Sequence, residues 1–319
     1  MIWLGPKRGY FTDWITQRWV QATGRRIDLA ADAWLSGPVA PTSGIGPDYF
    51  TTFAKSEGCV IHAFNKGAGV LPRFGALASA NFDASAVHRT VAQFYERTAA
   101  YELDAWAEWC GLFRPFGWLL AVLFSRRLQQ LNVPLSGLDT SQGMTNEVLE
   151  FFDSVTGALR HTAWYRRLPG TGNILYAGFY SVCTLPGRAD PCVKVVFPLP
   201  NGNAIVIMGA ESRPDGSLVV TSAGDRFGQP GFYFTVHGDR GTAWARYVRA
   251  LRESIHVFPA ENGVLRANHV LTFVGATFLR LHYRMRYSGN FAEPGASPNG
   301  GPAQRLGNSG VGGGPPSVS

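Results

Sequence analysis

Residues 193–209, VKVVFPLPNGNAIVIMG, constrain the fold more than any other part of the chain. Two runs rich in Val, Ile and Phe flank the pair Asn201 and Gly202. Asn-Gly suits the positive φ angles of a short hairpin turn, and β-branched residues favour strands. A second turn signal, Pro-Asp-Gly at residues 214–216, leads to another β-rich run. The sequence therefore predicts three consecutive antiparallel strands here.

The surrounding region, residues 146–286, has the same character and reads mainly as antiparallel strands. Its short β-rich runs alternate with turn residues, and no internal repeat is visible. Further predicted strands lie at residues 160–168, 173–183, 231–238, 264–275 and 276–286.

Three stretches are interpreted as helices. In residues 83–109, Val87, Val91 and Phe94 recur at three- and four-residue intervals, which is typical of an amphipathic helix. Residues 118–131 are mostly apolar and end just before a proline-containing segment. Residues 242–255, TAWARYVRALRESI, also read as helical.

Together these elements predict an α+β fold, in which long helices cover a curved, mainly antiparallel sheet of about eight strands. Residues 1–82 are aromatic but interrupted by Gly and Pro, so we expect an irregular segment packed on the core. Residues 83–287 are expected to form the core domain. Residues 288–319 are so rich in Gly, Pro and Ser that we expect a disordered tail.

The most apolar stretch, residues 116–127, reads FGWLLAVLFSRR. It is shorter than the roughly 20 apolar residues that a membrane-spanning helix needs. We predict a helix that buries its apolar side chains and exposes Arg126 and Arg127 at its end. The alternative is an interfacial helix with Trp118 at the headgroup boundary, which would make the chain a peripheral membrane protein.

Charge and cysteine content argue against several classes of function. The net charge is +7, but no block of like charges and no known reader motif indicates nucleic-acid binding. The four cysteines lack zinc-type spacing, and no nucleotide-binding glycine signature is present, so we expect neither a metal nor a cofactor. The amino terminus lacks the long apolar region of a secretory signal, and we expect a cytoplasmic protein.

Residues 278–286 separate into two faces when read as a strand. One face carries Leu279 and Leu281, whereas the other carries Arg280, His282 and Arg284. Such a basic face is either the solvated side of the sheet or, if enclosed, a site for the anionic end of a ligand. The candidate ligand-binding residues are Arg280, His282, Arg284, Tyr95 and Trp118.

Two histidines are the candidates for catalysis. A hairpin turning at residues 275–276 would place His269 directly opposite His282. Facing imidazoles can transfer protons near neutral pH, although the sequence shows no nucleophile motif and no third metal ligand. An enzyme using histidine and arginine for acid–base chemistry is therefore one hypothesis.

The preferred hypothesis is binding of an apolar or amphipathic small molecule, or a lipid, between helices and sheet. At the level of architecture alone, the expected arrangement resembles helix-grip and half-barrel lipid carriers, cyclases and dehydratases. No family motif accompanies this resemblance, so it assigns no residue a role. A non-enzymatic interaction protein is the remaining alternative, and the oligomeric state is open.

Overall fold

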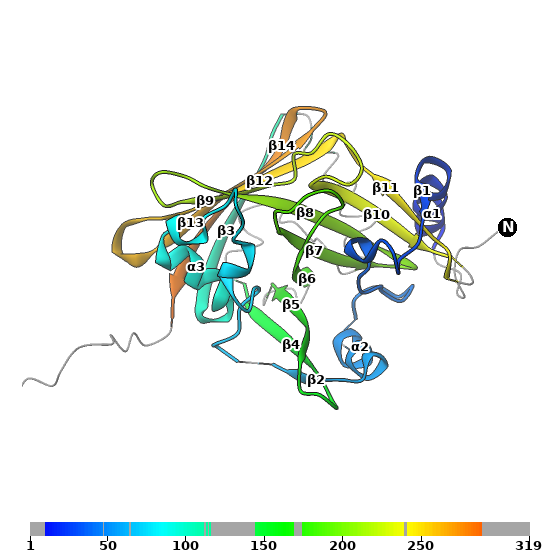
Figure 1. Cartoon of the computed structure of the whole chain (residues 1–319), viewed down its shortest axis with the longest axis horizontal. Helices are drawn as coiled ribbons and strands as arrows, with labels where there is room; N and C mark the ends of the chain where they lie inside the picture. Colours follow the sequence, from blue (N-terminus) through cyan, green and yellow to red (C-terminus); the bar gives the residue numbers. More distant parts are fainter. Residues whose placement is uncertain are drawn as a thin grey trace, which may run out of the picture. The chain divides into compact units, whose positions relative to one another are not determined.

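A single antiparallel sheet of 14 strands dominates the described part of the computed structural model (Figure 1). Three α-helices accompany it in that part of the chain, namely α1 (Phe11–Thr23), α2 (Tyr49–Glu57) and α3 (Arg89–Glu96). The structure describes residues 10–46, 48–63, 65–111, 113, 115, 144–168, 174–238 and 241–288.

Eleven of the strands follow one path, in the order β2-β4-β5-β6-β7-β8-β9-β12-β13-β14-β3. The sheet branches at β8. One edge of β8 pairs with β7, and the other edge pairs with β10 along its first part and with β9 along its last part. The branch continues from β10 to β11 and β1. The strands are β1 (Arg25–Ile27), β2 (Cys59–His62), β3 (Tyr101–Trp109), β4 (Glu147–Asp153), β5 (Leu159–Arg167), β6 (Ile174–Cys183), β7 (Cys192–Leu199), β8 (Gly202–Ser212), β9 (Leu218–Thr221), β10 (Gly231–His237), β11 (Ala243–Tyr247), β12 (Leu251–Pro259), β13 (Leu265–Phe273) and β14 (Ala276–Tyr287).

The predicted meander around residues 193–221 is confirmed, with one change in its first turn. Leu199 pairs with Gly202, so the turn residues are Pro200 and Asn201, and Asn201 has the positive φ of 57°. Gly202 is required for a different reason. A Cβ atom there would meet the backbone oxygen of Thr235 on β10 at 2.0 Å, so the glycine permits β10 to lie close to the start of β8.

The predicted α+β fold with long covering helices is wrong, because the described chain is mostly β. Residues 83–109 contain the short helix α3 and then the strand β3. The helix ends where Thr98 donates a hydrogen bond to the carbonyl of Phe94 and accepts one from the amide of Val70. Beyond the helix, burial along β3 alternates with a period of two, so that Tyr101 and Leu103 are buried and the residue between them is exposed.

The helix predicted at residues 242–255 is also wrong. That stretch forms β11, a turn and the first half of β12. Both strands are held by neighbours from other parts of the chain, β10 and β1 for β11, and β13 and β9 for β12. Pairing with two partners outweighs the local preference of the sequence.

Two hydrophobic clusters occupy opposite faces of the central strands. Val195 and Val206 are opposite each other and belong to one cluster, whereas the next pair, Val196 and Ile205, belongs to the other. The first cluster is completed by α3 and by apolar residues between positions 68 and 87, and the second by α2 and the turn Ala33–Leu35. The amino-terminal third of the chain thus supplies a layer to each face.

Several predictions concern segments outside the described residues. These are the apolar helix of residues 116–127, including Trp118, and the tail from residue 289 onward. Among the helices that the structure does describe, none combines the length and apolar character needed to cross a membrane.

Candidate functional site

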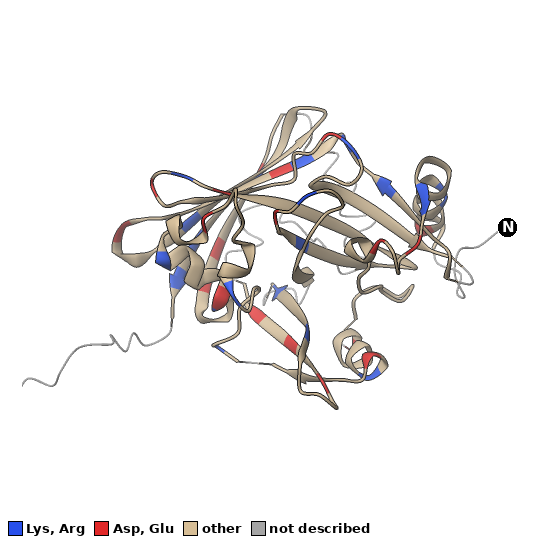
Figure 2. Ribbon diagram, in the orientation of Figure 1, with Lys and Arg blue, Asp and Glu red and all other residues tan. Residues whose placement is uncertain are grey.

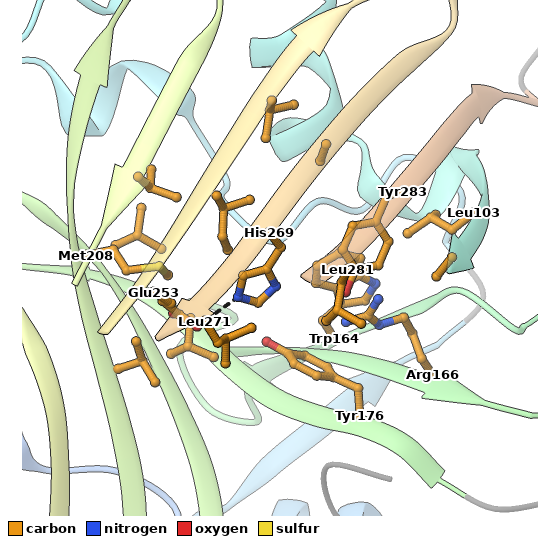
Figure 3. Close-up of a pocket in the computed structure, with 18 of the residues that line it drawn as sticks. Leu103, Trp164, Arg166, Tyr176, Met208, Glu253, His269, Leu271, Leu281 and Tyr283 are labelled. Atoms are coloured by element: carbon orange, nitrogen blue, oxygen red, sulfur yellow. Dashed lines mark hydrogen bonds and ion pairs between the residues drawn. The ribbon is translucent and has the colours of Figure 1, made fainter. Parts of the chain in front are cut away.

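A cavity of about 210 Å³ lies on the face of the sheet that carries the first cluster. Residues of β3, β5–β9 and β12–β14 line it, so the sheet surrounds this space on several sides. Most of the wall is aliphatic or aromatic, with Leu103, Met208 and Leu281 as examples (Figure 3). An apolar cavity with few polar groups is the usual form of a small-molecule site.

A carboxylate and an imidazole form one polar group in this wall. Glu253 on β12 and His269 on β13 join through Oε2 and Nε2 at 3.0 Å, as Figure 3 shows. Their side chains are only 9% and 15% exposed, respectively. The carboxylate therefore fixes the orientation of the imidazole ring in a largely dry environment.

The second polar group is Arg166 on β5, which is 5% exposed. Its guanidinium carbon lies 4.2 Å from the ring centroid of Trp164 and 4.3 Å from that of Tyr176. Trp164 precedes it by two positions on the same face, and Tyr176 is its direct partner on β6. Both rings therefore hold the guanidinium by cation–π contact.

Two tyrosines add a pair of hydroxyl groups to the lining. The hydroxyls of Tyr176 and Tyr180 are 2.6 Å apart, and both residues line the cavity. Burial raises the pKa of each hydroxyl above its ordinary value. Both stay protonated at neutral pH, so the pair keeps one O–H to donate after forming its internal hydrogen bond.

The structure separates the candidates that the sequence grouped together. Tyr95 and His269 line the cavity, and Tyr95 is buried on α3. Arg280, His282 and Arg284 lie on the opposite side of β14 from the lining residues Leu279 and Leu281. Trp118 is outside the described residues.

The basic side chains of β14 lie next to acidic side chains of the neighbouring strand β3. Arg284 pairs with Asp104 at 2.7 Å, and Arg280 pairs with Glu108 at 3.4 Å. A third pair joins Arg286 and Glu102 at 3.4 Å. Figure 2 marks these charges along the two strands. The strand alternation predicted for residues 278–286 is confirmed, and its positive charges already have carboxylate partners.

The predicted facing of His269 and His282 is wrong. His269 is opposite Leu281, and His282 is opposite Asn268, to which its Nδ1 is hydrogen-bonded at 2.8 Å. The turn uses Val274 and Gly275, both with positive φ, rather than residues 275–276. A bulge after Leu271 then shifts the register again. The observed register differs from the predicted register by an odd number of residues, so the two imidazoles lie on opposite faces of the sheet.

Sequence reasoning missed Arg166 and Glu253. The alternation of Thr162, Trp164 and Arg166 on one face of β5 was a usable signal, because an arginine in line with buried residues is unusual. Glu253 was hidden by the helical interpretation of residues 242–255, in which a glutamate is an ordinary solvent-facing residue.

A second hollow, of about 650 Å³, lies beside α2 and residues 36–46. It contains His161 and His237, and burial lowers the pKa of both imidazoles. Its lining is mainly loop residues, so the cavity within the sheet is the stronger candidate site. Within the described part of the chain, no cluster of three or more potential ligands could hold a metal ion.

No family model and no solved structure matches the chain. The chain is 26% identical over 222 residues to a Bacillus subtilis (strain 168) protein described as "Uncharacterized membrane protein YndJ". The match covers 69% of this chain but 38% of that protein, so the chain corresponds to well under half of the relative.

Proposed function

We propose that this protein binds a small amphipathic molecule in the cavity within the sheet. The observation that carries the proposal is the combination of an apolar wall with Arg166 and the Glu253–His269 pair, all on the cavity side. Apolar walls bind a hydrocarbon portion, and a few fixed polar groups orient the polar end. The similarity to a protein described as a membrane protein is consistent with a ligand that membranes can supply.

The size of the cavity limits the ligand. The volume of about 210 Å³ is below the range of about 300–1,000 Å³ that is usual for pockets binding drug-sized molecules. This favours a short or medium-length hydrocarbon chain over a complete two-chain membrane lipid. The described cavity also lies inside a sheet rather than between long helices, which changes the location predicted from the sequence.

Filling the cavity tests this proposal. Ala267 is 4% exposed and Ala105 is 7% exposed, and both line the cavity. We expect Ala267→Phe or Ala105→Phe to reduce binding of eight-carbon probes, octanoate and 1-octanol, at least tenfold by isothermal titration calorimetry. Val155→Phe is the matched control, because Val155 is 91% exposed. Absence of binding to the unmodified protein, or full binding to a folded cavity-filled variant, would contradict the proposal.

A second candidate function is supported by the Glu253–His269 pair. A carboxylate that orients a buried imidazole can support general-base catalysis on a ligand in the same space. The probe is 2-octanone in D₂O, whose α-protons exchange for deuterium when a base removes them. We expect exchange faster than in buffer and its loss in His269→Gln. Binding without accelerated exchange would leave the protein a binding protein and reject this candidate.

A further inference from the structure

The cavity contains a buried positive charge without a negative partner among the described residues. The structure shows no hydrogen-bond partner for Nε of Arg166, and it records no ion pair for this guanidinium within the described chain. Arginine cannot release its proton in a protein, so the charge stays when the side chain is buried. An uncompensated buried charge costs free energy, and proteins normally pair such groups.

Two other arginines of the described strands show what pairing looks like in this molecule. Arg284 has Asp104, and Arg167, the immediate neighbour of Arg166, has Glu147 at 3.0 Å. Arg167 and Arg284 are 44% and 42% exposed at their side chains. Arg166, which is less accessible to water than these two, has no recorded carboxylate partner within the described chain.

The acidic group in the cavity forms no recorded ion pair with Arg166 within the described chain. Glu253 is bound to His269 through its Oε2, and its backbone amide is anchored to Ser222 on the neighbouring segment. The ring centroids of Trp164 and Tyr176 lie 4.2 and 4.3 Å from the guanidinium carbon and 5.7 Å from each other, with the ring planes inclined at 70°, so the two rings lie on adjacent sides of the guanidinium and do not enclose it. A planar fork of N–H donors matches the two oxygens of a carboxylate.

We infer that the ligand is an amphipathic anion, a short- or medium-chain carboxylate whose two oxygens bind Arg166 while its hydrocarbon chain fills the apolar cavity. This inference rests on the proposed binding function and adds the charge and chemical class of the ligand. The Tyr176–Tyr180 pair has one further O–H to donate on the same side of the sheet.

A set of three probes with the same chain length isolates the charge. Octanoate, 1-octanol and octylamine differ at the end group while sharing an eight-carbon chain. We expect the unmodified protein to bind octanoate at least tenfold more tightly than 1-octanol, and octylamine most weakly. Trp164 next to the guanidinium gives a fluorescence signal, and calorimetry supplies an independent affinity.

Substitutions of Arg166 then assign the effect to this residue. Arg166→Met should lower octanoate affinity at least tenfold and leave 1-octanol affinity within about twofold. Arg166→Lys keeps the charge but loses the planar fork, so an intermediate affinity is expected. Arg160→Met is the control, since Arg160 lies on the same strand with an exposed side chain that contacts Glu57.

The outcomes distinguish the inference of an anionic ligand from the proposed binding function. Equal affinities for octanoate and 1-octanol would overturn the anion inference while leaving the proposed binding function intact. Binding of none of the three probes would contradict the proposed function, and the inference would fail with it. If Arg166→Met does not fold, the probe comparison on the unmodified protein and on Arg166→Lys still decides the question.

Discussion

The two faces of β7 and β8 are both buried, yet they are filled in different ways. The back face is the side of the sheet that carries the second hydrophobic cluster. There, Phe53 of α2 packs against Phe151 and Phe179, with ring centroids 5.5 and 5.1 Å apart, respectively. The other face has Val195 and Val206 in its wall and keeps an open volume. Consecutive residues of one strand serve both faces, so the cavity is not caused by a shortage of apolar side chains.

Both faces contain a buried cation, and Lys194 of β7, which is 6% exposed on the face of the second cluster, donates to the carbonyl of Ser36 at 2.6 Å. The cavity side places Arg166 and the Glu253–His269 pair within an apolar wall. On the back face, the arginines of β14 are paired with carboxylates of β3 at the surface. In the proposed function, the cavity side carries the candidate site and the opposite face contributes stability.

The largest expected effect comes from truncating an aromatic residue on each face. Phe151 is 0% exposed on the packed face, and Phe197 is 7% exposed in the cavity wall. Phe151→Ala should reduce the free energy of unfolding by about 3–5 kcal/mol, because a packed ring leaves a void. Phe197→Ala should cost less, because part of its ring already faces empty space and makes fewer contacts.

Denaturant unfolding of the two variants measures the difference directly. Octanoate titration adds a second criterion, since Phe197→Ala alters the cavity and Phe151→Ala does not touch it. Equal losses of stability would show that the cavity wall is packed as tightly as the back face. In that case the contrast between the faces would be incorrect.

A smaller effect of opposite sign is expected at Arg166 in the ligand-free protein. Arg166→Met removes a buried charge and keeps much of the side-chain volume, so we expect stability to rise by about 1 kcal/mol or more. Loss of cation–π contact with Trp164 and Tyr176 offsets part of this gain. Arg160→Met on the same strand should change stability little.

Thermal unfolding at one protein concentration, without added ligand, checks this sign. A gain in stability together with a loss of octanoate affinity would show that Arg166 is retained at the expense of stability. A clear loss of stability in Arg166→Met would instead indicate that the guanidinium already has a stabilising partner, which would weaken the argument for an anionic ligand.

The sequence was informative where local signals agreed with the fold. The hairpin near Asn201 and the alternation of residues 278–286 were correctly predicted, because positive φ and period-two patterns are local properties, although the turn itself lies one residue earlier than predicted. The strand β3 was missed because Tyr101 and Ala105 are four residues apart, which fits both a helix and one face of a strand. The acidic alternation of Glu102, Asp104 and Glu108 was the better signal.

The site itself depended on relations that local patterns do not contain. The facing of His269 depends on where one turn begins and on a bulge, and a change of one residue reverses the face. The isolation of Arg166 depends on β6, whose Tyr176 lies opposite it. No spacing within β5 reveals that neighbour, so the sequence directed attention to the exposed arginines of β14 instead.

The smallest expected effect concerns those exposed arginines and compares Arg284 with Arg166. Both Nε and Nη2 of Arg284 donate to Oδ2 of Asp104, at 3.0 and 2.7 Å, but its side chain is 42% exposed. Water competes for such a pair, so Arg284→Gln should lower the free energy of unfolding by less than about 1 kcal/mol.

Octanoate affinity should stay within about twofold of the unmodified value, because the side chain points away from the cavity. Calorimetry on Arg284→Gln and Arg166→Met under identical conditions makes the comparison. A loss of affinity in Arg284→Gln as large as in Arg166→Met would place the ligand on the back face and reverse the roles assigned to the two faces.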